Sequence, residues 1–103
     1  MRKFNVKDIK QHIDPIWYFE NRIVQFNLRP KRSSDGWITT GLCPFHADRR
    51  PGSLSLNLET GSFRCWSCGA KGGDIIEFEK KLRNAPFAET IRALSIEFGG
   101  GQI

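Results

Sequence analysis

The sequence has little that would place the chain in or across a membrane. No run of apolar residues approaches the roughly 18 residues that a membrane-spanning helix needs. The N-terminus Met1-Arg2-Lys3-Phe4-Asn5 is basic but lacks the apolar core of a signal peptide. We therefore expect a cytoplasmic protein without membrane contact.

Cysteine is also scarce, because the chain has three in 103 residues. A secreted scaffold held by disulfides usually has an even number of cysteines, so an odd count argues against that class. Cysteines of a cytosolic protein are not expected to form lasting disulfides. The spacing of the three cysteines therefore becomes the informative property.

The length of 103 residues allows one domain with one modest hydrophobic core. Domains this small often need a metal, a disulfide or a partner for stability. Sixteen Lys and Arg against eleven Asp and Glu give a formal charge of +5. This balance excludes an acidic disordered tail and makes a polyanion a reasonable partner.

Helical patterns lie at both ends of the chain, over residues 5–22 and 74–98. In the first segment, Pro15 either ends one helix or opens a second with Asp14 as its N-cap. In the second segment, Asp74 and Glu77 have the spacing of a capping box. We expect two helices there, the second starting at Pro86 and ending at Gly99.

The middle of the chain, residues 23–72, has the patterns of a small antiparallel sheet. Residues 23–29 alternate between apolar and polar side chains, and residues 37–42 are predicted to return beside them. A second hairpin is predicted from residues 53–58 and 62–66. The expected fold class is therefore α+β.

A tight turn at Thr60-Gly61 in the second hairpin predicts a definite register. It pairs Leu58 with Phe63, and Asn57 with Arg64. One face of this hairpin is then apolar. The other face is polar and basic, with an exposed aromatic ring, and is formed by Ser55, Asn57, Arg64 and Trp66.

Two ligand pairs flank this hairpin, Cys43-x-x-His46 and Cys65-x-x-Cys68, with eighteen residues between them. Zinc prefers four tetrahedral nitrogen and sulfur ligands, and Cys₃His is a known structural set. The pattern predicts one structural zinc ion. Arg64 and Lys71 are available to offset the net negative charge of zinc bound to three thiolates. The alternatives are another metal, buried apolar cysteines with a surface histidine, or thiol redox chemistry at Cys65 and Cys68.

A longer set of residues resembles the Cys-His-Cys-Cys zinc-binding domain of bacterial DnaG-type DNA primases. The similarity extends from about Val24 to Phe98. The residues that carry it are Cys43-Pro44-Phe45-His46, Asp48, Pro51, Ser53, Phe63, Cys65, Cys68-Gly69, Gly72 and Asp74.

The resemblance implies a zinc ribbon on a small antiparallel sheet with flanking N- and C-terminal helices. It also implies binding of single-stranded template DNA during primer synthesis, with a TOPRIM primase subunit and a replicative helicase as partners. The chain departs from the family because no TOPRIM carboxylate cluster is present. We therefore expect a non-catalytic module of a bacterial, phage or mobile-element replication system, or a fragment of a longer primase.

Single-stranded DNA is held by cations along its backbone and by aromatic rings that stack on bases. Simpler interpretations stay open for several candidates: Arg49 and Arg50 would only solvate a loop, Trp66 would cover the zinc sulfurs, and Trp37 would belong to the core. The candidate DNA-binding residues are Arg29, Lys31, Arg32, Trp37, Arg49, Arg50, Ser55, Asn57, Arg64, Trp66 and Lys71.

The alternative function is a zinc-ribbon module that binds a protein partner without intrinsic DNA affinity. Neither function predicts a small-molecule substrate. Measured affinity for single-stranded DNA separates the two.

Overall fold

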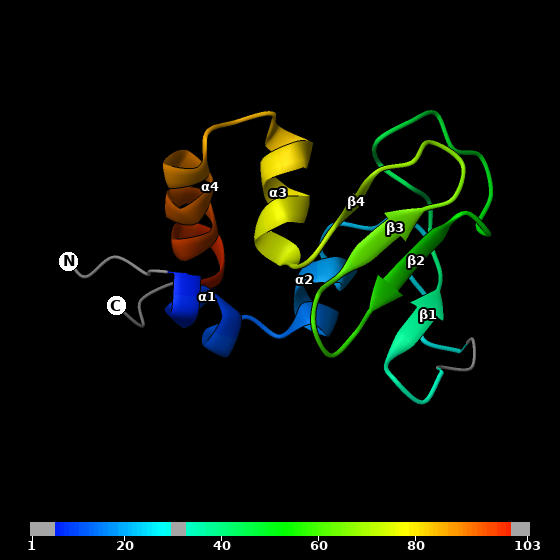
Figure 1. Cartoon of the computed structure of the whole chain (residues 1–103), viewed down its shortest axis with the longest axis horizontal. Coiled ribbons are helices and arrows are strands. Elements are labelled where there is room, and N and C mark those ends of the chain that lie inside the picture. The colour runs from blue at the N-terminus through cyan, green and yellow to red at the C-terminus, as the bar shows by residue number, and fades with distance from the viewer. Residues whose placement is uncertain (1–5, 30–32, 100–103) are drawn as a thin grey trace.

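The computed structural model describes residues 6–29 and 33–99, and it has a small antiparallel sheet beside a group of helices (Figure 1). No helix within these ranges has the length and hydropathy needed to cross a membrane. The elements, in chain order, are α1 (Val6–His12), α2 (Pro15–Glu20), β1 (Trp37–Thr39), β2 (Leu54–Asn57), β3 (Phe63–Cys65), β4 (Lys71–Gly72), α3 (Ile75–Arg83), α4 (Phe87–Leu94) and a π-helical turn (Ser95–Gly99).

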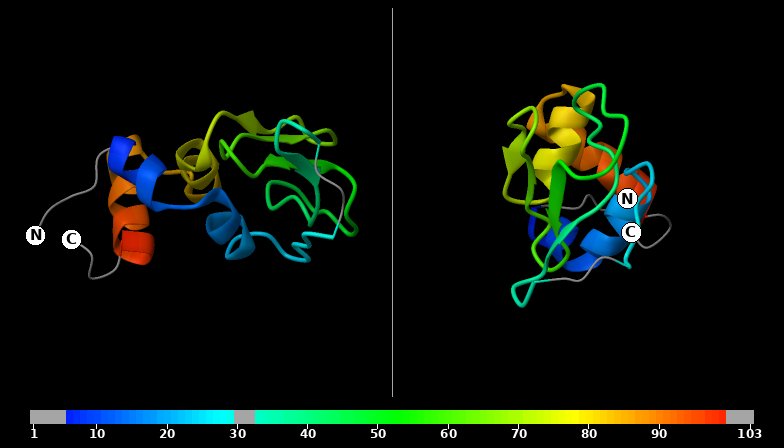
Figure 2. Two further views of the ribbon diagram at one scale, coloured as in Figure 1. Left: turned by 90° about the horizontal axis from the view of Figure 1, so that it is seen from below. Right: turned by 90° about the vertical axis from the view of Figure 1, so that its right-hand side faces the viewer.

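The predicted α+β class is confirmed. The sheet has the strand order β1-β2-β3-β4, and every neighbouring pair is antiparallel. Helix α3 lies between the sheet and α4 in Figure 1 and in the left-hand view of Figure 2. On the outward side of the sheet Thr39, Arg64 and Lys71 are exposed, and no helix of the described residues covers them.

Local signals in the sequence set where the helices begin. Pro15 opens a second helix, and Asp14 caps it by accepting a hydrogen bond of 2.7 Å from the Ile16 amide. Asp74 caps α3 in the same way, with 2.9 Å to the Glu77 amide. These starts match the predictions because a cap needs only neighbouring residues.

The predicted register of the second hairpin is wrong by two residues along β2. Leu56, not Leu58, lies opposite Phe63. The turn is longer because the Asn57 side chain organises it: its Oδ1 accepts hydrogen bonds from the amides of Glu59 (2.9 Å) and Thr60 (3.0 Å). An even shift keeps Ser55 and Arg64 on the predicted outward side of the sheet, whereas Asn57 is buried in the turn.

The strand predicted over residues 23–29 does not form. Gln25 has a φ of 62°, which interrupts the extended conformation. The segment is instead fastened by side-chain contacts, since the Thr40 hydroxyl bonds both the amide and the carbonyl of Asn27 at 2.8 Å. Within the part of the chain that the structure describes, β1 therefore pairs only with β2, and it ends at Thr39.

The core lies between the sheet and the helices. Phe78 of α3 is its centre, with ring centroids 4.8 Å from Phe63 and 5.2 Å from Phe19. Ile38 and Leu56 extend the apolar surface across the inner side of the sheet, with exposed fractions of 2% or less. This packing fixes the strands that carry the metal ligands.

A charged group is buried within the helices. Glu79 is 1% exposed and accepts hydrogen bonds from Tyr18, Arg22 and Arg83. Burial acts to raise the pKa of Glu79, but these donors outweigh it and hold the pKa below its ordinary range. Arg22 also bonds Glu97 at 2.6 Å, so the network joins α2, α3 and the C-terminal turn.

Candidate metal centre

The four predicted metal ligands converge on one point. Cys43 and His46 come from the loop after β1, while Cys65 ends β3 and Cys68 lies in the following turn. Their ligand atoms all lie within 4.8 Å of one another. No other group of three or more His, Cys, Asp or Glu over residues 6–29 and 33–99 meets this criterion, which agrees with a single metal.

The distances fit a tetrahedral zinc ion. Zinc–sulfur bonds of about 2.3 Å place two tetrahedral sulfurs about 3.8 Å apart. The Sγ atoms of Cys43 and Cys68 are 3.9 Å apart, and Sγ of Cys65 lies 3.4 Å from Nε2 of His46. The site therefore suits one zinc ion, with all four positions taken by protein ligands. Such a closed set is typical of a structural role.

Backbone amides stabilise the sulfurs as thiolates. The Phe45 amide lies 3.4 Å from Sγ of Cys43, and the Cys68 amide lies 3.5 Å from Sγ of Cys65. Gly69 makes the second turn possible, because its φ of 82° suits a residue without a side chain. Its amide then donates to the Cys65 carbonyl at 2.9 Å.

The two buried thiols have different pKa values. Burial raises the pKa of Cys43 to about 12. Burial also opposes ionisation of Cys65, but the amides of Cys68 and Ser67 outweigh it and bring its pKa to about 7. A metal ion needs both as thiolates, so binding must displace protons from the protein.

Asp48 positions the first ligand pair. Its Oδ2 accepts a hydrogen bond of 2.9 Å from the Cys43 amide and lies 4.0 Å from Nε2 of His46. The carboxylate thus holds the loop that presents both ligands. A carboxylate in this position orients the ligands and does not itself bind the metal.

One row of outward side chains crosses the whole sheet. Thr39 lies opposite Ser55, Ser55 opposite Arg64, and Arg64 opposite Lys71. We call Thr39, Ser55, Arg64 and Lys71 the cross-strand row. It places two cations directly opposite each other, which is unfavourable for a sheet alone. Thr39 is absent from the predicted DNA-binding residues because its position opposite Ser55 follows only from the β1–β2 register.

Trp66 extends the cross-strand row at the end of β3. Its indole is 65% exposed, and Nε1 donates a 3.1 Å hydrogen bond to Oγ of Ser55. The Arg64 guanidinium lies over the ring, 4.0 Å from its centroid. The ring is therefore an exposed, fixed surface feature and not a buried cover for the sulfurs.

The remaining candidate DNA-binding residues differ in their exposure to solvent. Arg29, Arg49 and Arg50 are exposed, and Trp37 is half-buried. The predicted outward position of Asn57 is wrong, because its side chain is 5% exposed and its amide donates to the Asp35 carbonyl at 3.0 Å. The candidates Lys31 and Arg32 lie outside the described residues.

Curated proteins similar to the chain are DNA primases. It is 31% identical over 90 residues to a DNA primase of Clostridium acetobutylicum, covering 87% of this chain and 13% of that protein. It is 40% identical over 60 residues to a DNA primase of Lactococcus lactis, covering 58% and 9% respectively. The chain therefore spans about a tenth of the length of these relatives.

A solved structure has the same fold. The crystal structure of the Aquifex aeolicus primase, with its zinc-binding and RNA polymerase domains, gives a TM-score of 0.65 at 23% identity. The similarity covers 96% of this chain and 22% of that one. The CHC2 zinc finger family model matches residues 2–100. Taken with the Cys-His-Cys-Cys cluster, these matches show that the chain belongs to the CHC2 zinc finger family of DnaG-type DNA primases.

Proposed function

We propose that the chain binds single-stranded template DNA through the cross-strand row and Trp66, as the zinc-stabilised module of a primase system. The observation that carries the proposal is the row itself. It combines two cations, two hydroxyls and an adjoining indole on the sheet face away from α3. Cations suit the phosphates and the indole suits the bases of an unpaired strand.

The charges of the cross-strand row support an anionic ligand. Among the ion pairs within residues 6–29 and 33–99, none involves Arg64 or Lys71. The same holds for Arg49 and Arg50, which follow the first ligand pair. Cations that no carboxylate neutralises retain their full attraction for a phosphate backbone. Zinc bound to three thiolates would carry a negative charge close to Arg64. That charge would offset part of the repulsion between Arg64 and Lys71.

The relatives give the proposal its context. They are DNA primases many times longer than this chain. We infer a role in primer synthesis during DNA replication in the cytoplasm, for a bacterial, phage or mobile-element genome. Polymerisation would come from a separate TOPRIM subunit working with a replicative helicase. The zinc module itself supplies template binding and no catalysis.

Charge reversal tests the proposal. Arg64→Glu and Lys71→Glu should weaken binding of a fluorescent single-stranded oligonucleotide in an anisotropy titration over a salt series. Each lost phosphate contact should reduce the slope of log affinity against log salt by about 0.7. Arg92→Glu makes the same charge change at an exposed position of α4 and serves as the matched control.

Two results would overturn the proposal. The first is an unchanged slope in both row variants. The second is an equal loss in the Arg92→Glu control, because a general charge effect would then explain the change. Either result would favour the protein-interaction module.

A further inference from the structure

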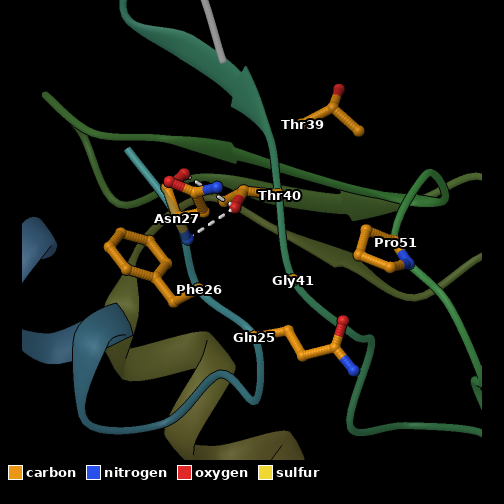
Figure 3. Close-up of a pocket in the computed structure, with 7 residues that line it drawn as sticks. All are labelled: Gln25, Phe26, Asn27, Thr39, Thr40, Gly41 and Pro51. Atoms are coloured by element: carbon orange, nitrogen blue, oxygen red, sulfur yellow. Dashed lines mark hydrogen bonds between the residues drawn. The ribbon is translucent and has the colours of Figure 1, made fainter. Parts of the chain in front are cut away.

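We propose that the pocket beside β1 holds one unstacked nucleobase of the bound strand and reads its polar edge. This inference rests on the proposed binding of single-stranded DNA and adds a site for base discrimination to it. The pocket has a volume of about 400 Å³, within the range of small-ligand sites. Its lining residues are Gln25, Phe26, Asn27, Thr39, Thr40, Gly41 and Pro51 (Figure 3).

The wall of the pocket is held in a fixed conformation. The buried Thr40 hydroxyl bonds both the amide and the carbonyl of Asn27 (Figure 3), and the Leu42 amide donates to the Val24 carbonyl at 2.9 Å. Gly41 also permits close packing, because a Cβ there would lie 2.1 Å from the Ile23 side chain. The site is therefore formed before a ligand arrives, which reduces the entropy cost of binding.

Gln25 occupies an unfavourable backbone conformation between these two attachments. Its φ of 62° lies in the left-handed region, where glycine and asparagine are the usual residues. Strained backbone of this kind gathers at ligand-binding segments. In Figure 3 the Gln25 side chain extends along the Gly41 backbone toward the side where Pro51 lies. The conformation thus directs an amide along the pocket wall.

The polar groups of the pocket match the edge of a base. The Gln25 amide has no hydrogen-bond partner among the described residues. Oδ1 of Asn27 accepts from the Arg29 amide at 2.9 Å, while its NH₂ group has no such partner there. Amide side chains pair a donor with an acceptor, as nucleobase edges do. Phe26 and Pro51 add the apolar surface that a flat base needs.

The pocket adjoins the proposed DNA-binding surface. Thr39 belongs both to the pocket lining and to the cross-strand row, where its Oγ1 lies 3.1 Å from Oγ of Ser55. Ser55 in turn accepts the hydrogen bond from Trp66. A strand that stacks on Trp66 and follows the row across the sheet therefore reaches the pocket. This continuity favours a nucleobase over an unrelated small ligand.

Titration with free deoxynucleosides tests the pocket without any phosphate. In ¹⁵N-labelled protein, one or more of the four should shift the side-chain amide signals of Gln25 and Asn27. Gln25→Gly should weaken this binding about tenfold, since a paired amide contact contributes that order of discrimination. Glycine accepts the left-handed φ, so the variant keeps the backbone. The control is Gln11→Ala, at an exposed position of α1. Alanine is used there because glycine would destabilise the helix.

A panel of oligonucleotides that differ at one position separates the two proposals. Gln25→Gly should remove base discrimination at that position and leave the salt slope unchanged, whereas Arg64→Glu should do the reverse. If no nucleoside shifts the Gln25 and Asn27 signals, or if Gln25→Gly binds it equally well, the pocket proposal is overturned. If nucleosides and strands bind there but Arg64→Glu leaves the salt slope of strand binding unchanged, the pocket stands and the proposed DNA-binding row fails.

Discussion

Tyr18 Oη donates a 2.6 Å hydrogen bond to Oε1 of Glu79, across 61 positions of sequence. The contact is buried and joins α2 to α3. Arg22 reinforces it, because its Nε lies 2.8 Å from the same carboxylate oxygen. The helices beneath the sheet thus depend on one carboxylate.

We predict that Glu79→Gln lowers the free energy of unfolding by about 3 kcal/mol, because it leaves buried donors without their charged acceptor. Chemical unfolding of the zinc-loaded protein measures the change. Glu97→Gln removes a more exposed carboxylate from Arg22 and should cost less than about 1 kcal/mol. Equal effects of the two variants would contradict the importance of the buried contact.

Stability should also depend on pH through Glu79. Its folded pKa lies below the ordinary value of 4.5, so its contribution is complete above that pH and is lost as the pH falls through the folded pKa. The difference in unfolding free energy between the native protein and Glu79→Gln should therefore shrink below about pH 4.5. Both proteins are measured with zinc in excess at each pH, so their difference isolates the carboxylate. A difference that stays constant with pH would contradict this assignment.

Removal of zinc should unfold the sheet. Metal binding supplies on the order of 10 kcal/mol in small zinc domains, which is comparable with the whole stability of a domain. A chelator should therefore abolish the cooperative thermal transition and change the fluorescence of Trp66, which follows a ligand directly. Added zinc should restore both signals. An unchanged transition after verified metal loss would argue against a structural zinc.

Asp48→Asn should weaken zinc binding without removing a ligand. The amide keeps an acceptor for the Cys43 N–H but loses the charge near His46. Partners of this kind typically contribute 10- to 100-fold in metal affinity, and we expect about tenfold. Competition with a coloured zinc chelator measures this. Asp35→Asn makes the same change in the turn before β1 and should leave the zinc affinity unaltered.

The parts of the fold that depend on nearby residues could be predicted from the sequence. Asp14 and Asp74 cap helices through bonds to residues two and three positions away. The two ligand pairs are local as well, and zinc chemistry then requires that they meet. Strand pairing depends on the conformation of the turn. The Asn57 side chain organises a longer turn than predicted, so the observed register of the second hairpin differs from the predicted one.

Longer-range features had no sequence signal. The left-handed Gln25 lies within an alternating pattern that favours a strand, and only its fastening to Thr40 and Leu42 explains the difference. From the sequence, Glu79 is typical of an exposed helical residue. Its burial is explained only by the contacts with Tyr18 and Arg22, which are distant in the sequence. Thr39 joins the cross-strand row only through the observed register.

Arg64 and Cys65 are consecutive residues of β3, one facing solvent and the other ending in the metal site. On the proposed function, this adjacency makes zinc and DNA thermodynamically linked ligands. If bound zinc raises the affinity for the strand by some factor, the bound strand raises the affinity for zinc by the same factor. The template would then protect its own binding module against metal loss, and chelation or thiol oxidation would release the DNA.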